Sequence, residues 1–252
     1  MTNYNKLLNN LNELKLSAMA DNLDSVISSV VNGHKDFTDG LYELTEYQVS
    51  YKRKKESEWC IQWGAFPFRK TFEDFDFSFQ PSINKKEVLE FKTLRFMEKA
   101  ENILFVGSPG VGKTHLAVSI GLEAAAHKNQ VRFITCGDLL AQLSKAYSEG
   151  KLDSKLALYS RYKVLIIDEI GYMPIDKMSA NLLFQLINKR YERRSTIITT
   201  NKALNKWGEM FNDNVMANAI LDRLLHHSHI INITGRSYRL KDIVMESQDK
   251  SD

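Results

Sequence analysis

The sequence has few of the residues that would support a disulfide framework, and no segment suited to a membrane. It contains two cysteines, Cys60 and Cys136, which are far apart and lack the paired spacing of a zinc or redox motif. We therefore expect no structural disulfide. No run of about 18 apolar residues is present, and polar residues interrupt the amino-terminal stretch, so neither a spanning helix nor a signal peptide is expected. These absences favour a cytoplasmic protein without membrane contact.

The composition is that of an ordinary folded protein with one uneven charge distribution. The 252 residues are 43% hydrophobic and 26% charged, which is enough for one large domain or two modest ones. The net charge is only +3, but the stretch from Gln185 to Lys241 holds ten Lys and Arg residues against four acidic ones. This excess indicates a polyanionic partner, either a nucleotide or a nucleic acid.

Hydrophobic patterning divides the chain into a helical part and an α/β part. Apolar residues recur every three or four positions before residue 70, so residues 1–70 are predicted to form a helical domain. The alternating aromatics of "FEDFDFSFQP" predict an extended segment within a linker over 71–84. Residues 85–252 alternate helical stretches with apolar, β-branched runs, which predicts an α/β domain with a mainly parallel, five-stranded sheet between helices. The predicted strands are 102–106, 131–135, 163–168, 195–200 and 229–234.

The first predicted strand is followed by "GSPGVGKTH", which matches the phosphate-binding pattern G-x-x-x-x-G-K-[ST]. Glycines allow backbone N–H groups to surround phosphates, and the following helix contributes the positive end of its dipole. A lysine reaches the β- and γ-phosphates, and a Thr hydroxyl binds Mg²⁺. We expect ATP and Mg²⁺ here. The predicted cofactor-binding residues are Gly107, Ser108, Pro109, Gly110, Val111, Gly112, Lys113, Thr114 and His115, although His115 is also explained as an ordinary first-turn residue.

Acidic and polar residues follow two later predicted strands. Asp168 and Glu169 end "VLIIDE", where Asp168 would bind Mg²⁺ with Thr114 and Glu169 would orient or deprotonate the attacking water. Without the phosphate loop, the pair would equally fit a solvated strand end. Asn201 ends "TIITTN" and would lie between Asp168 and the γ-phosphate, or simply terminate a strand. The adjacent glutamate favours ATP hydrolysis over phosphoryl transfer to a second substrate.

Taken together, these motifs resemble those of P-loop AAA+ ATPases of the DnaC/IstB type, particularly the IstB-like ATP-binding proteins of insertion sequences. The resemblance covers nearly the whole chain and includes "LKLSAMADNL", "FEDFDF", "LIIDEIGYMP", "KWGEMFND" and "AILDRLLHHSHIINITGRSYRLK". It implies a sensor role for Asn201, an arginine finger at Arg223 that serves a neighbouring subunit, and a second sensing arginine at Arg239. The Leu-Pro common after the sensor asparagine is missing, and the short remainder of the chain implies a reduced lid.

The resemblance also implies partners. It predicts a homo-oligomer, ring-shaped or helical, that assembles with ATP on double-stranded DNA and assists a cognate transposase. The helical domain would supply DNA, partner or oligomer contacts. A DnaC-like replicative helicase loader and a nucleotide-dependent switch with negligible turnover are the alternatives. Basic residues in "YKRKK", "INKRYERRS" and "NKALNKW" are candidates for DNA phosphate contacts or for solvated helix faces.

Two aromatic groups need separate interpretations. Phe75 and Phe77 precede the ATPase core and are candidates either for packing or for an adenine pocket. His226, His227 and His229 could suggest a metal, but adjacent side chains on a helix diverge by about 100°, so His226 and His227 would ligate poorly together. We therefore expect partly buried or interface histidines.

Overall fold

The computed structural model describes residues 2–240, which form two compact units. The contacts divide the chain between Trp59 and Cys60, earlier than residue 70, where the sequence pattern placed the end of the helical domain. Met1 and residues 241–252 lie outside the described residues, so the last part of the predicted domain 85–252 and Lys241 of the basic stretch are not described. No described helix is both long and apolar enough to cross a bilayer.

The first unit is helical, in agreement with the amphipathic pattern. It contains α1 (Asn3–Glu13), α2 (Ser17–Val31) and most of α3 (Phe37–Trp63), whose last residues belong to the second unit. Its small core consists of Leu11, Leu23, Val26 and Leu44. The buried Gln48 of α3 accepts a hydrogen bond from the N–H of Ala18 at 3.0 Å, which ties α3 to the start of α2.

The second unit is built on a five-stranded sheet, and the registered neighbours all pair in parallel. The strand order is β2-β3-β4-β1-β5. The strands are β1 (Asn102–Gly107), β2 (Val131–Thr135), β3 (Val164–Ile170), β4 (Ser195–Thr200) and β5 (Ser228–Ile233). All five strands were predicted from apolar runs, to within two residues at each end.

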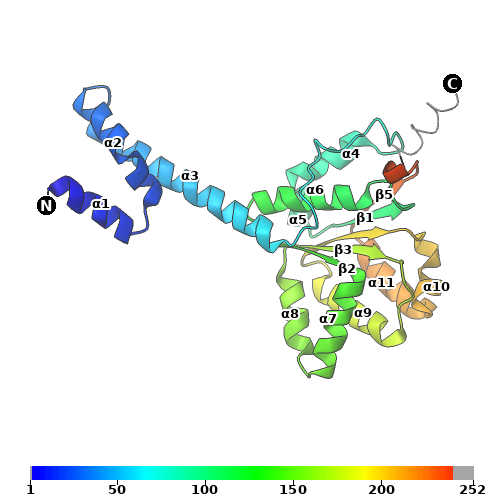
Figure 1. Cartoon of the computed structure of the whole chain (residues 1–252). Coiled ribbons are helices and arrows are strands. Elements are labelled where there is room, and N and C mark those ends of the chain that lie inside the picture. The colour runs from blue at the N-terminus through cyan, green and yellow to red at the C-terminus, as the bar shows by residue number, and fades with distance from the viewer. Residues whose placement is uncertain (1, 241–252) are drawn as a thin grey trace. The chain divides into compact units, whose positions relative to one another are not determined.

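Helices cover both faces of this sheet, as Figure 1 shows. Side chains alternate along each strand, so Ile103 and Phe105 of β1 pack on one side while Leu104 packs on the other. The first side is covered by α4 (Lys85–Glu90), η1 (Phe91–Thr93), α5 (Arg95–Glu98) and α6 (Lys113–Ala126). The second is covered by α7 (Cys136–Ser148), α8 (Leu152–Arg161), α9 (Lys177–Arg190), α10 (Trp207–Phe211) and α11 (Asn214–Leu225). Two short 3₁₀ turns, η2 (Leu204–Lys206) and η3 (Tyr238–Leu240), complete the described elements.

The prediction of an extended segment at "FEDFDFSFQP" is wrong. The segment forms consecutive turns, in which Asp74 accepts from the N–H of Thr71 at 2.7 Å and Asp76 accepts from the N–H of Ser78 at 3.1 Å. Aspartate side chains that bond nearby backbone N–H groups favour such turns over strands. Phe72 and Phe75 are buried in the core that includes α6, so the aromatic spacing reflects turn packing rather than strand alternation.

Candidate nucleotide site

A cavity of about 390 Å³ lies at the carboxyl ends of the strands. It is lined by residues that follow β1 (Gly110 to His115) and by the ends of β2 (Thr135), β3 (Asp168) and β4 (Thr199 to Asn201). In the order of strands, β1 lies beside β4, and the chain then crosses to β2 at the edge. Ligands of open α/β sheets bind where the connections diverge in this way, and the volume suits a small molecule.

The loop after β1 requires two of its glycines. Gly110 and Gly112 have φ angles of +81° and +101°, which L side chains rarely adopt. A Cβ on Gly112 would also lie 2.5 Å from the ring of Phe75. Gly112 caps α6 without any side-chain hydrogen bond, so the first N–H groups of this 14-residue helix remain available. A helix start of this kind, at the edge of a cavity, fits a phosphate group.

Lys113 begins α6 and is buried. Its ammonium Nζ donates to the carbonyl of Ser108 at 2.7 Å, which bends the side chain back over the loop. Burial lowers the pKa of Lys113, and the nearby positive charge of Arg239 lowers it further, while Asp168 opposes the shift. Arg239 and Lys113 both line the cavity, so two cationic groups converge on the space beside the helix start.

Asp168 lies in a polar cluster at the end of β3. The hydroxyl of Thr114 donates to its Oδ1 at 3.0 Å, which joins the phosphate loop to the acid. The hydroxyl of Thr199 donates to the same oxygen at 2.5 Å and accepts from the N–H of Glu169 at 2.9 Å. Burial raises the pKa of Asp168, and the two hydroxyl hydrogen bonds oppose that shift. A buried carboxylate beside a Thr hydroxyl is a donor set that suits Mg²⁺.

A backbone irregularity aims Glu169 at the same cavity. Neighbouring residues of a regular strand point to opposite faces, so Asp168 and Glu169 would normally diverge. The pairing of β3 with β4 shifts register between Ile167 and Ile170, and Glu169 has a φ of +63°. A bulge redirects side chains in this way, and the left-handed conformation costs free energy for a non-glycine residue. Both carboxylates therefore line one cavity.

Asn201 follows β4 and lines the cavity. Its Oδ1 atom is buried and has no hydrogen-bond partner among the described residues. A buried amide oxygen without a partner is costly in a folded protein and commonly marks a functional position. Asn201 thus has an acceptor left free for a group that enters the cavity.

Thr199 is the residue of this cluster that the sequence reasoning missed. The run "TIITTN" contains a signal, because period-two alternation in an extended run places Thr199 and Asn201 on the same side. Thr199 is buried, and its hydroxyl contacts both the side chain of Asp168 and the backbone of Glu169.

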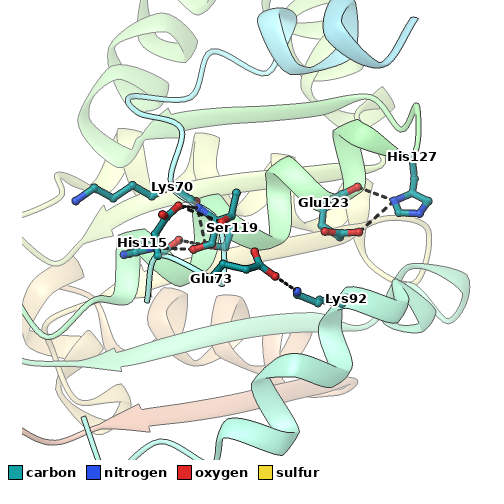
Figure 2. Close-up of polar contacts among 9 residues, drawn as sticks. Lys70, Glu73, Lys92, His115, Ser119, Glu123 and His127 are labelled. Carbon is teal, nitrogen blue, oxygen red and sulfur yellow. Dashed lines mark hydrogen bonds and ion pairs between the residues drawn. The ribbon is translucent and has the colours of Figure 1, made fainter. Parts of the chain in front are cut away.

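The turn segment before α4 packs on α6 through polar contacts. Figure 2 shows this segment along α6, with Ser119 donating to the carbonyl of Lys70 at 3.1 Å and the Glu73 carboxylate paired with Lys92. The imidazole of His115 contacts the carbonyl of Thr71 at 2.8 Å (Figure 2), and burial lowers its pKa.

The rings of Phe75 and His115 lie 5.2 Å apart with an edge-to-face angle of 74°. Phe75 contacts both His115 and the cavity, whereas Phe77 packs against Phe75 with ring centroids 4.8 Å apart and does not line the cavity. Phe75 is therefore positioned both for packing and for contact with a flat ligand ring, and Phe77 for packing.

The remaining predicted site residues lie outside the cavity lining. Gly107 ends β1, and Ser108 and Pro109 begin the loop, where Ser108 contributes the carbonyl that binds Lys113. Arg223 lies on α11, where its Nε donates to Asn188 of α9 at 2.8 Å and its guanidinium stacks on Phe184 at 4.6 Å. Arg223 is thus not brought to the cavity of its own chain.

Two further expectations need correction. Helix α11 ends at Leu225, so His226 and His227 are not adjacent on a helix, and their rings lie 4.1 Å apart instead of diverging. Among the basic residues proposed for DNA contacts, Arg190 is only 1% exposed. It donates to the carbonyls of Tyr159, Tyr162 and Ser195, which excludes it as a phosphate ligand.

Comparison with known proteins identifies the family of this chain. The family model for "IstB-like ATP binding protein" matches residues 9–245. The chain belongs to this family. This chain is 49% identical over 246 residues to a protein named as an insertion sequence IS232 ATP-binding protein of Bacillus thuringiensis subsp. berliner. The match covers 98% of each chain. It is 43% identical over 239 residues to the IS5376 counterpart of Geobacillus stearothermophilus, with 95% of each covered.

Solved structures share the fold of this family member. The crystal structure of the DnaC helicase loader matches with a TM-score of 0.51 and 28% identity, covering 60% of this chain and 88% of that one. The crystal structure of DnaI matches with a TM-score of 0.57 and 22% identity, covering 66% of this chain and 92% of the DnaI chain. The predicted P-loop AAA+ fold is confirmed, and the family assignment is consistent with the expected ATPase activity.

Proposed function

We propose that the protein binds ATP with Mg²⁺ in the cavity and hydrolyses it to ADP and phosphate. The observation that carries this proposal is the convergence of Thr114, Asp168 and the unpartnered oxygen of Asn201 on one cavity, beside a start of α6 that no side chain caps. Mg²⁺, held by Thr114 and Asp168, would neutralise charge on the β- and γ-phosphates. Phe75 and His115 would face the adenine side of the nucleotide.

The residues of this chain divide the work of hydrolysis. The ammonium of Lys113 leaves the Ser108 carbonyl and binds the phosphates, with the loop N–H groups around them and Arg239 as a second cation. Asn201 orients the attacking water, and the carboxylate of Glu169 takes its proton as the oxygen bonds to the γ-phosphorus and the bond to ADP breaks. Arg223 would complete the site of a neighbouring subunit, because its planar guanidinium suits a phosphate oxygen and lies outside its own cavity.

Two variants test this assignment. Glu169→Gln should retain ATP binding but lose phosphate release, because the amide cannot accept the proton of water. Lys113→Ala should lose nucleotide binding itself. Binding of a fluorescent ATP analogue and release of phosphate, measured on the same preparations, separate the two effects. Unchanged phosphate release by Glu169→Gln would remove Glu169 from the mechanism, and binding without turnover in the unmodified protein would indicate a nucleotide switch.

The biological role that we propose is ATP-dependent assistance of a transposase in the cytoplasm. The support is the 49% identity to an insertion-sequence protein over 98% of both chains. ATP would stabilise a homo-oligomer, ring-shaped or helical, on double-stranded DNA, and hydrolysis would release it. Exposed basic residues supply candidates for phosphate contacts on each unit: Lys52, Arg53, Lys54 and Lys55 on α3, and Lys189, Arg193, Arg194, Lys202 and Lys206 on the second unit.

A replicative helicase loader is the second candidate, because the DnaC helicase loader shares 28% identity and the same fold. The two roles differ in DNA preference. We would measure the mass of the complex by light scattering with a slowly hydrolysed ATP analogue, on duplex and single-stranded DNA of equal length. A discrete assembly on duplex alone supports the transposition role. Assembly only on single strands, or only after a helicase is added, supports the loader.

A further inference from the structure

Two turns on the α9 and α11 side of the sheet bring three metal-binding side chains together. Glu192 lies in the turn between α9 and β4, and His226 and His227 lie between α11 and β5. The Glu192 Oε1 atom is 3.4 Å from Nδ1 of His226 and 3.6 Å from Nε2 of His227. One ligand atom from each of the three residues lies within 4.8 Å of the other two. All three side chains are about half exposed, so an ion can reach them from solvent.

These separations match the edges of a coordination tetrahedron. Zinc bonds of about 2.0–2.1 Å to nitrogen and oxygen require ligand atoms about 3.3–3.4 Å apart around the ion. The two distances from the Glu192 oxygen are close to this value, and the ligand nitrogens of the two histidines lie within 4.8 Å of each other. Imidazole and carboxylate donors suit Zn²⁺ and its neighbours in the first transition series, rather than Mg²⁺. Two histidines and one glutamate also leave a fourth position for water.

The backbone holds this arrangement in place. Glu192 adopts a φ of +55°, an unusual conformation for a non-glycine residue, which turns its side chain back toward the end of α11. His226 is the C-cap of α11, and its ring also contacts the hydroxyl of Tyr191 at 2.7 Å through the same Nδ1 atom. A metal at Nδ1 must displace this hydroxyl, so Tyr191 competes with the ion.

We propose that Glu192, His226 and His227 form a binding site for a Zn²⁺-type divalent transition metal, separate from the nucleotide cavity. The bound ion would connect the end of α9 to the end of α11. Arg223 lies three residues before His226, and its Nε already donates to Asn188 of α9. Metal binding would therefore replace the Tyr191–His226 contact with a metal link between the ends of the same two helices, and it would restrict the helix that carries Arg223.

The test is Zn²⁺ binding by calorimetry on the full chain without a histidine tag. The protein is first treated with a chelator, and millimolar Mg²⁺ is present without nucleotide so that Asp168 does not compete. We expect one Zn²⁺ per chain. His227→Ala and Glu192→Gln should each weaken binding by about tenfold or more, since each removes one of three ligands. Tyr191→Phe should strengthen it, because the competing hydroxyl is gone.

The matched control is His127→Ala, which removes an exposed histidine that is paired with Glu123 at 3.5 Å and has no third ligand nearby among residues 2–240. It should bind Zn²⁺ as the unmodified protein does. Cobalt provides a second readout, because Co²⁺ at a four-coordinate site gives intense visible absorption bands, and the His227→Ala variant should lack them. Equal Zn²⁺ affinity in His227→Ala and the unmodified protein would overturn the proposal, as would the absence of a stoichiometric site.

Discussion

Replacing Thr199 by valine isolates one hydroxyl that supports both carboxylates of the nucleotide site. Valine has nearly the same shape but cannot donate to Asp168 or accept from the N–H of Glu169. A hydrogen bond to a charged group contributes about 1.5–3 kcal/mol and one between neutral groups about 0.5–1.5 kcal/mol. The variant should therefore lose roughly 2–4 kcal/mol of folding free energy. For a unit of this size, such a loss lowers Tm by roughly 5–15 °C.

The loss should depend on pH in a direction that the structure fixes. Burial raises the pKa of Asp168, and the Thr199 hydrogen bond opposes this, so the variant should raise that pKa further. A raised folded-state pKa gives stability that is present below the unfolded value of about 3.8 and is lost as pH rises through the folded value. The difference in Tm between the two proteins should therefore be small near pH 4 and large at neutral pH.

Circular dichroism melts from about pH 4 to pH 7.5 measure this difference. Thr199→Ser is the control, because it keeps the hydroxyl and should lose only about 1 kcal/mol for one methyl group. Introducing Thr199→Val into an Asp168→Asn background should cost less than in the unmodified protein, since the strong acceptor is gone. A Tm difference that does not vary with pH, or an equal loss in both backgrounds, would refute the role assigned to the Asp168 hydrogen bond.

Other predictions follow from buried polar groups. Asp168→Asn should raise Tm at neutral pH, because the charged form is the one that burial disfavours; an unchanged or lower Tm would contradict this. Arg190→Lys should destabilise by about 2–4 kcal/mol in urea melts, because one ammonium cannot replace the forked contacts to three carbonyls, whereas the exposed Arg193→Ala should be nearly neutral. Burial raises the pKa of Cys136 to about 12, so a thiol reagent at pH 8 should modify it only after urea is added; fast labelling of the folded protein would contradict its burial.

Much of the fold could be predicted because apolar runs report burial directly. The five strands appear as short β-branched stretches, and each matches the structure to within two residues at each end. The phosphate loop was equally clear, since its glycines are required by backbone geometry wherever the motif occurs. The prediction of an extended segment at "FEDFDFSFQP" was wrong because period-two spacing of aromatic residues arises in consecutive turns as well as in strands. Only the aspartates of this segment indicated the turns.

Side-chain relationships between distant segments were not predictable. The bulge that turns Glu169 depends on the pairing of β3 with β4, which no local pattern encodes. The burial of Arg190 depends on carbonyls from α8 and β4. The basic stretch "INKRYERRS" therefore does not reveal that one of its arginines is buried. The contact of His226 with His227 depends on where α11 ends. For Glu169 and Arg190, deciding partners are remote in sequence, whereas for the two histidines the end of the helix decides.

The irregular end of β3 has a consequence for how this protein can change under selection. The left-handed backbone at Glu169 and the buried charge of Asp168 both act against folding, and both are tied to the nucleotide site. Substitutions that relieve them, such as Glu169→Gly, would yield a more heat-resistant chain with an impaired site. A library screened for thermal resistance alone would therefore enrich inactive sequences, so directed evolution of this protein needs phosphate release in the same screen.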